Sequence, residues 1–363
     1  MTLTERLRRL DVTTVIMWII GGLLLFFIVL GSIQSILKGT YTPAQWFDFF
    51  VFGISQGSIY ALIALGYTMV YGILKMINFA HGEVFMMGAL TTYFLADEMN
   101  RRGVFDDKGA LGQTLLSTLF GLIVLFAVAI FISMTVAVLL ERVAYRPLRG
   151  APRLVPLITA IGASFFLQYT ARGLYGSNNR SYPNVDLLKG TVTFGQFSIQ
   201  VVQIVVAVTA IAMMIGLYLF VQRTKTGKAI LAVAEDKQAA ALMGIDVDRT
   251  IVITFALGGA MAGVAAILYA IMFRQAHFFM GFIPGIKAFT AAVLGGIGNI
   301  PGAMLGGLFL GIFESLGPTL FLDGLGINSP NQLKDVIAFT MLVLILIFRP
   351  TGIIGERLSE KKA

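Results

Sequence analysis

The chain has 363 residues, of which 57% are hydrophobic and 13% are charged. Soluble domains average about 25% charged residues, so one globular core cannot hide this much apolar surface. The net charge of +8 does not indicate nucleic-acid binding, because the basic residues lie mostly between apolar runs, where they set topology and contact anionic lipid. The chain has no cysteine, which excludes disulfides, thiolate metal sites and a cysteine nucleophile. Composition therefore predicts an integral membrane protein.

Uncharged runs recur along the chain, and the long ones approach or exceed the about 18 residues that indicate a spanning helix. They cover residues 15–37, 49–74, 115–140, 154–171, 198–221, 250–273 and 288–313. Two shorter runs, 84–96 and 336–348, need polar flanks or neighbouring helices to cross. The pattern predicts an all-α polytopic bundle of eight to ten transmembrane helices.

Two of the long runs have features of their own. The first, 15–37, follows Arg6, Arg8 and Arg9 as in a signal peptide, but its length and the absence of a clear small-x-small cleavage site favour a retained anchor helix. The last run is interrupted by Gly298-Asn299-Ile300-Pro301-Gly302, so we expect two short helices and at least one broken or re-entrant segment there.

The distribution of Lys and Arg predicts the orientation. If the N-terminus is inside and the spans alternate, most of the 27 basic residues fall on the inner side, as the positive-inside rule requires. The inner residues are Arg6, Arg8, Arg9, Lys75, Arg142, Arg146, Arg149, Arg153, Arg223, Lys225, Lys228, Lys237, Arg249, Arg349, Arg357, Lys361 and Lys362. Both termini are then cytoplasmic, and the polar loop 173–197 lies outside.

Glycine pairs spaced four residues apart recur in the runs. Glycines at i and i+4 make a flat helix face that lets another helix approach closely. We therefore expect close helix packing; the alternative is that glycine is simply common in membrane helices. The pairs are Gly53/Gly57, Gly259/Gly263, Gly302/Gly306 and Gly307/Gly311.

The charged inner segment 223–249 is predicted to be helical from Gly227 to Met243. Gly244 would end that helix, and Asp246 or Asp248 would cap the next one. Gln238-Ala239-Ala240, three residues and Gly244 resemble the EAA loop of ABC importer permeases, a short helix that docks in a groove on an ATPase. Gln238 replaces the usual leading Glu, the trailing Ile-x-Leu-Pro is absent, and Glu235 lies one turn earlier. The alternative is an ordinary amphipathic loop helix.

Longer motifs make the comparison specific. They are Gln56–Tyr67, Val70-Tyr71-Gly72, Ile77–Glu83, Glu141–Arg149, Ala234–Arg249, Gly295–Ala303 and Arg349–Gly352. Over residues 47–357 the sequence strongly resembles the branched-chain amino acid ABC transporter permease family, and most closely its shorter, H-type subunit. Members of that family often begin near the run at 49, so the 15–37 span is an addition.

The resemblance implies a non-enzymatic transport subunit in the bacterial inner membrane. Its partners would be a homologous M-type permease subunit, two cytoplasmic ATPases, a periplasmic amino-acid-binding protein and membrane lipid. The chain has no G-x-x-x-x-G-K-[ST] motif, so it would bind no cofactor and ATP would be used by the partner subunits. We expect an N-terminal segment with its anchor over residues 1–40, a permease domain over 41–357 with a coupling loop at 223–249, and a charged tail at 358–363.

Polar residues inside the apolar stretches are candidates for the transport pathway or gate: Gln56, Tyr60, Asn78, His81 and Glu83. For the last three, a structural latch is the competing hypothesis. Asn78 would satisfy freed backbone groups, Gly82 would allow a bend, and Glu83 would lie at the positive N-terminal end of the 84–96 helix. Gln56 and Tyr60 more often bond a neighbouring helix. Glu314 is expected at the interface.

Three other functions compete with the main prediction, and a metal site is a separate hypothesis. A urea or short-amide permease of the same family differs only in its cargo. A self-powered secondary transporter would need a coupling Lys or carboxylate deep in a span, and the long runs hold none. No set of Ser, His and carboxylate residues converges as in an intramembrane enzyme. A metal site from His81, Glu83 and His277 is disfavoured by their spacing.

Overall fold

The structure is a computed structural model that describes residues 12–105, 115–152, 154–328, 330–349 and 351–354. The basic residues Arg6, Arg8, Arg9, Arg153, Arg357, Lys361 and Lys362 and the tail 358–363 lie outside the described residues. The helices are α2 (Val12–Lys38), α3 (Pro43–Leu74), α4 (His81–Arg101), α5 (Leu115–Leu140), α6 (Leu154–Tyr175), α7 (Val201–Arg223), α8 (Lys225–Glu235), α9 (Lys237–Leu242), α10 (Val247–Phe273), α11 (Phe282–Gly295), α12 (Ile300–Gly317) and α13 (Lys334–Phe348).

The predicted all-α membrane bundle is confirmed. Eight helical segments among the described residues are long and apolar enough to cross a bilayer, and every long uncharged run corresponds to a helix. The 21-residue α4 and the 14-residue α11 complete the bundle. The predicted interruption is also present, because the last long run divides into α11 and α12.

Local sequence accounts for where these helices start and stop. Thr42 begins α3 with a capping box, in which Thr42 Oγ1 accepts from Gln45 N at 3.3 Å and Gln45 Oε1 accepts from Thr42 N at 2.8 Å. Between α11 and α12, Gly296 adopts a φ of 107° that side chains disfavour. Asn299 then caps α12 by accepting a hydrogen bond from Gly302 N at 3.0 Å.

The core of the bundle is α3, which packs most extensively on α12 and also contacts α7, α10 and α11. Its contact with α12 is a glycine seam, formed by Gly53 and Gly57 on α3 and Gly307 and Gly311 on α12. A Cβ atom at Gly57 would lie 2.7 Å from the carbonyl oxygen of Gly307, so the two backbones are in direct contact. The predicted close packing is therefore observed.

The other predicted glycine pairs also lie at helix contacts. A Cβ atom at Gly259 or Gly263 of α10 would be 2.7 Å from a backbone oxygen of α5. Gly302 and Gly306 of α12 face α11. Small residues thus set the spacing of three helix pairs around the core.

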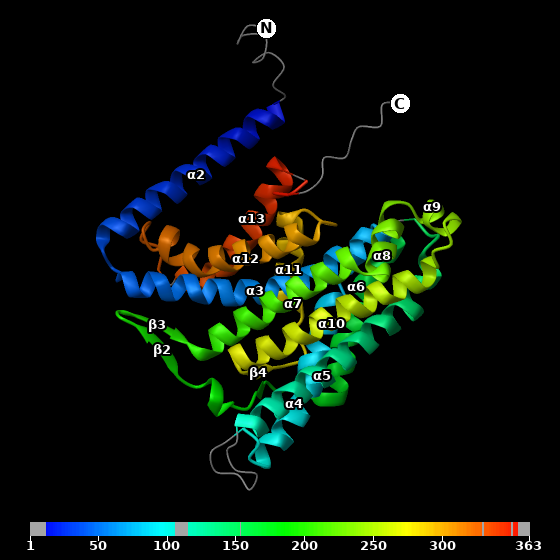
Figure 1. Ribbon diagram of the computed structural model, residues 1–363. Helices are drawn as coiled ribbons and strands as arrows, with labels where there is room; N and C mark the ends of the chain where they lie inside the picture. The colour runs from blue at the N-terminus through cyan, green and yellow to red at the C-terminus, as the bar shows by residue number, and fades with distance from the viewer. Residues whose placement is uncertain (1–11, 106–114, 153, 329, 350, 355–363) are drawn as a thin grey trace.

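The anchor helix α2 leans away from the bundle (Figure 1). It contacts the π-helical turn Pro318–Leu322 that extends α12, where Ser35 Oγ donates to the carbonyl of Thr319 at 2.8 Å. Lys38 Nζ donates to the carbonyl of Gly324 at 3.2 Å. Most of the apolar side chains of α2 are exposed, as expected for a helix that faces lipid.

The bundle has two different ends (Figure 1). One, which we call the coupling end, carries α8 and α9. The other, the hairpin end, carries the antiparallel hairpin of β2 (Thr191–Phe194) and β3 (Phe197–Gln200). There β1 (Arg180–Ser181) pairs with β4 (Gln275–Ala276), which ties the segment after α6 to the segment after α10.

Candidate functional site

The coupling end is built from two short helices, so the prediction of one helix from Gly227 to Met243 is wrong. The chain breaks at Asp236, whose backbone is extended. Its carboxylate accepts from the N–H groups of Gln238 at 2.7 Å and Ala239 at 3.0 Å, and so caps α9. An aspartate that can satisfy two free N–H groups favours starting a new helix over continuing the old one.

The tip of the coupling end exposes two apolar side chains. Leu242 is 89% exposed and Met243 is 83% exposed, at the end of α9. Gly244 follows with a φ of 84°, which agrees with its predicted role in ending the helix. Glu235, Gln238 and Ala239 are also exposed, whereas Ala240 is buried against the protein.

Leu242 and Met243 were not singled out from the sequence. The available signal was an apolar pair directly before a helix-ending glycine, in a segment that is otherwise charged. Two adjacent, almost fully exposed apolar side chains outside the spanning helices are suited to contact a partner. The predicted coupling residues and these two therefore form one protruding tip.

A helix cap and several ion pairs attach this segment to the rest of the bundle. Asp246, one of the two predicted caps, begins α10 by accepting a hydrogen bond from Arg249 N at 3.0 Å. Asp248, the other, pairs instead with Arg146 at 2.6 Å and with Arg149. Arg149 also pairs with the buried Glu141. The α5–α6 connection, a π-helical turn over Glu141–Tyr145 followed by a 3₁₀ turn, is thereby joined to the start of α10.

The side chains of Asn78, His81 and Glu83 contact different partners and do not form one site. Asn78 Oδ1 accepts a hydrogen bond from the Tyr145 hydroxyl at 2.6 Å. Asn78 therefore binds a side chain of the α5–α6 connection and not the freed backbone groups that we predicted. It lies in the α3–α4 connection, so the bond joins two connections at the coupling end.

His81 is buried and has an aromatic neighbour. Its ring makes an edge contact with Tyr67 at 5.0 Å between centroids and lies directly against Gly66, where a Cβ atom would overlap the imidazole. The chain does not bend at Gly82, contrary to the prediction, because α4 begins at His81 and Gly82 is its second residue. A Cβ atom at Gly82 would lie 3.0 Å from the Cα of Gly285, so this glycine allows α11 to approach.

Glu83 lies in the first turn of α4, close to the predicted position, but its partners are on another helix. Gln168 Nε2 donates to its carboxylate at 2.7 Å and Ser164 Oγ donates at 3.2 Å. Both partners belong to α6. Glu83 therefore fastens α4 to α6, which supports the latch hypothesis for this residue more than the pathway hypothesis.

Gln56 and Tyr60 belong to a buried ionic cluster that was missed from the sequence. Gln56 Nε2 donates to the Tyr60 hydroxyl at 2.6 Å and to Glu314 Oε1 at 2.8 Å. Lys287 Nζ lies 2.6 Å from Glu314 and 2.6 Å from Asp335. The cluster joins helices α3, α11, α12 and α13.

The cluster adds to what the sequence showed. Glu314 is 2% exposed and therefore faces protein; its predicted position at the membrane interface stays a prediction. The long runs hold no Lys or carboxylate, yet charged residues are buried inside the bundle, because Lys287 is only 3% exposed. Lys287 and Glu314 directly flank the uncharged run 288–313. A search for charge-free runs therefore placed both residues outside the span.

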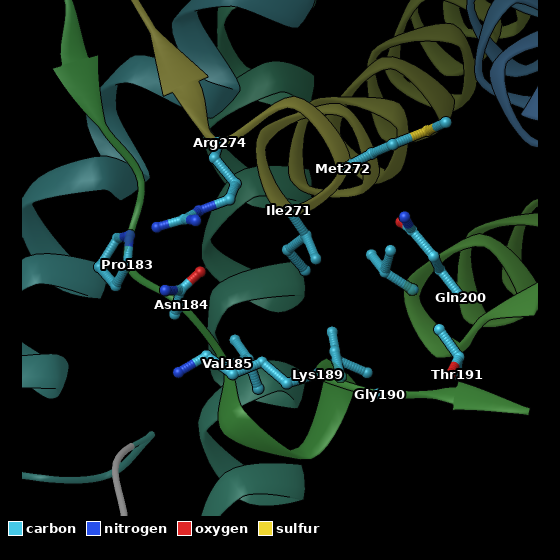
Figure 2. A pocket seen from close by; sticks show the side chains of 12 residues that line it. Pro183, Asn184, Val185, Lys189, Gly190, Thr191, Gln200, Ile271, Met272 and Arg274 are labelled. Atoms are coloured by element: carbon cyan, nitrogen blue, oxygen red, sulfur yellow. The ribbon is translucent and has the colours of Figure 1, made fainter.

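Possible metal ligands and one cavity remain to be described. Within the described ranges, no three His, Asp or Glu residues form a metal-binding group. A cavity of about 360 Å³ opens at the hairpin end, between residues 183–191, the start of α7 and the end of α10 (Figure 2). Figure 2 shows Asn184, Lys189 and Arg274 around this space.

The sequence was compared with known proteins. A family described as "branched-chain amino acid transport system / permease component" matches residues 49–346. The high-affinity branched-chain amino acid transport system permease protein BraD of Pseudomonas aeruginosa is 45% identical over 85% of this chain and 95% of its own length. The corresponding permease LivH is 42% identical in Escherichia coli and 41% identical in Salmonella typhimurium, each over 85% of this chain and 95% of its own length. The chain therefore belongs to the family of branched-chain amino acid transport permeases.

Proposed function

We propose that the chain is the H-type permease subunit of an ABC importer that carries branched-chain amino acids across the bacterial inner membrane. The names of BraD and LivH support the cargo. The proposed partners are a homologous M-type permease, two cytoplasmic ATPases that use the ATP, and an amino-acid-binding protein. The chain itself would catalyse no reaction and bind no cofactor.

The proposed orientation places the coupling end in the cytoplasm and the hairpin end outside. Basic residues of three connections support it, because Lys75, Arg146, Arg149 and Lys237 all lie at the coupling end. The binding protein would then dock at the hairpin end.

The observation that carries the proposal is the shape of the coupling tip. A capped six-residue helix presents exposed Leu242 and Met243 and ends at a left-handed glycine. Apolar side chains on a small capped helix fit a hydrophobic groove in a partner. Movement of an ATPase that binds this tip would be transmitted to α10 through the short link from Gly244 to Asp246.

The experiment replaces Gly244 in the complete importer, reconstituted in vesicles with its binding protein. Gly244→Val forces a β-branched side chain into the left-handed region, whereas Gly244→Asn can adopt it and serves as the matched control. We expect Gly244→Val to lower leucine uptake per ATP hydrolysed by about tenfold or more, because the strained chain would disrupt the tip, and Gly244→Asn to retain it. Undiminished uptake by Gly244→Val would contradict the role of the tip.

A secondary transporter is the one alternative that an observation favours, because the Lys287–Glu314 pair supplies the buried charges that such a transporter requires. The same vesicles decide between the two. Uptake that requires ATP and the partner subunits supports the importer. Proton-driven uptake by the purified chain alone would support the alternative. Parallel uptake assays with leucine and urea test the cargo.

A further inference from the structure

A second cavity, of about 230 Å³, lies at the coupling end among three connections. Lys75 comes from the α3–α4 connection, Arg149 from the α5–α6 connection, and Lys237 from α9. Three cationic side chains from separate segments therefore line one small space. Glu83, Leu242 and Met243 do not line this cavity.

The cations around this cavity are incompletely neutralised. Within the part of the chain that the structure describes, neither Lys75 nor Lys237 has an ion-pair partner. Arg149 pairs through its two terminal nitrogens, but its buried Nε has no hydrogen-bond partner among the described residues. Burial, then Arg149, then Lys75 lower the pKa of Lys237 from its ordinary value, so both neighbouring cations disfavour the charge on Lys237.

The remaining lining is apolar and reaches a lipid-facing helix. Leu74, Leu148 and Pro156 line the cavity beside the cations. Leu74 is the last residue of α3 and Pro156 lies in the first turn of α6, and both helices are long and apolar enough to cross a bilayer. The cavity thus combines a cationic part with an apolar wall at the ends of two spanning helices, which is the arrangement expected for an amphiphile with a negatively charged head.

We propose that this cavity binds the phosphate of an anionic phospholipid headgroup, with Lys75, Arg149 and Lys237 around the phosphate and the acyl chains against the apolar wall of Leu74, Leu148 and Pro156. A phosphate would relieve the repulsion between the cations. It would also hold α9 against the α3–α4 and α5–α6 connections. The lipid would therefore order the coupling segment before an ATPase binds it, whichever cargo the transporter carries.

The test is lipid retention by the complete transporter in detergent, measured by native mass spectrometry. The probes are dioleoyl phosphatidylglycerol, dioleoyl phosphatidylcholine and inorganic phosphate, each added separately and then phosphate in competition with phosphatidylglycerol. The site variant is Lys75→Gln/Lys237→Gln. The matched control, Lys225→Gln/Lys228→Gln, removes the same charge from exposed positions on neighbouring α8, outside the cavity.

We expect phosphatidylglycerol to remain bound to the wild type and to the control, and its retention to fall about tenfold or more in the site variant. Phosphatidylcholine should bind weakly to all three proteins, and inorganic phosphate should not displace the lipid, because it lacks the apolar contacts. Equal retention of phosphatidylglycerol by the site variant and the control would overturn the site. Displacement by millimolar phosphate would overturn the lipid as its ligand. Because all four lysines are exposed, the variants should elute as the wild type does in size-exclusion chromatography.

Discussion

Replacing Lys287 should destabilise the protein more than any other change to the ionic cluster. The side chain of Lys287 is 4% exposed and that of Glu314 is 1% exposed, and their charged atoms are 2.6 Å apart. Removing one partner of such a pair costs about 3–5 kcal/mol, because the other charge stays buried and unpaired. Gln56 still donates to Glu314 at 2.8 Å, so we expect Lys287→Met to cost about 3 kcal/mol, the lower end of that range.

The Asp335 contact provides the internal control. Its distance to Lys287 is also 2.6 Å, but the Asp335 side chain is 43% exposed. Asp335→Asn should have a smaller effect than Lys287→Met, because the Asp335 side chain reaches solvent and Lys287 keeps its buried partner Glu314. The two contacts have equal length, but the Glu314 carboxylate is more deeply buried.

The assay is thermal unfolding of the purified chain in detergent for Lys287→Met, Glu314→Gln, their combination and Asp335→Asn. Lys287→Met should have the lowest melting temperature of the single variants. The double variant should recover part of the loss, because no buried charge is then unpaired. Equal losses for Lys287→Met and Asp335→Asn, or strict additivity in the double variant, would refute the reasoning.

Three further predictions test the packing, the cap and the topology. Gly307→Val should prevent the contact between α3 and α12 and abolish the monodisperse chromatographic peak, whereas Gly22→Val, at a position with no neighbour within 4 Å, should not; equal behaviour would contradict the glycine seam. Asp236→Ala should cost α9 about 1 kcal/mol of helix stability and speed amide exchange over residues 237–242, and Asp236→Asn should restore protection; unchanged exchange in Asp236→Ala would contradict the cap. Because the chain has no cysteine, Gln238→Cys should react with an impermeant maleimide only from the cytoplasmic side and Ser198→Cys only from outside; the reverse would contradict the orientation.

The sequence was sufficient to predict the helices of the bundle, because a spanning helix needs a long apolar run and each such run is directly visible. It was also sufficient for a break near Gly298, observed at residues 296–299, and for the left-handed Gly244, since few residues other than glycine adopt the positive φ of Gly296, Gly298 and Gly244. These features are local, so neighbouring residues determine them.

The partners of the polar residues were not predictable, because they depend on which helices meet. Glu83 accepts a hydrogen bond from Gln168, 85 positions away, and Gln56 donates one to Glu314, 258 positions away. Lys287 was missed for a further reason: a charged residue normally marks the end of a span, and pairing with Glu314 and Asp335 stabilises it inside the bundle. Whether Gln56, Tyr60, Asn78, His81 or Glu83 contacts the cargo stays a prediction.

The bond between Asn78 and Tyr145 has a mechanical consequence when it is considered together with the pairs that Arg149 makes. The ends of α3, α4, α5 and α10 are joined at the coupling end by side-chain contacts, and α8 packs against α7. A displacement applied to α9 is therefore shared among several helices at once and does not simply bend one loop. A stiff coupling end would make the helices of the bundle move together as one rigid body when α9 is displaced by a small distance.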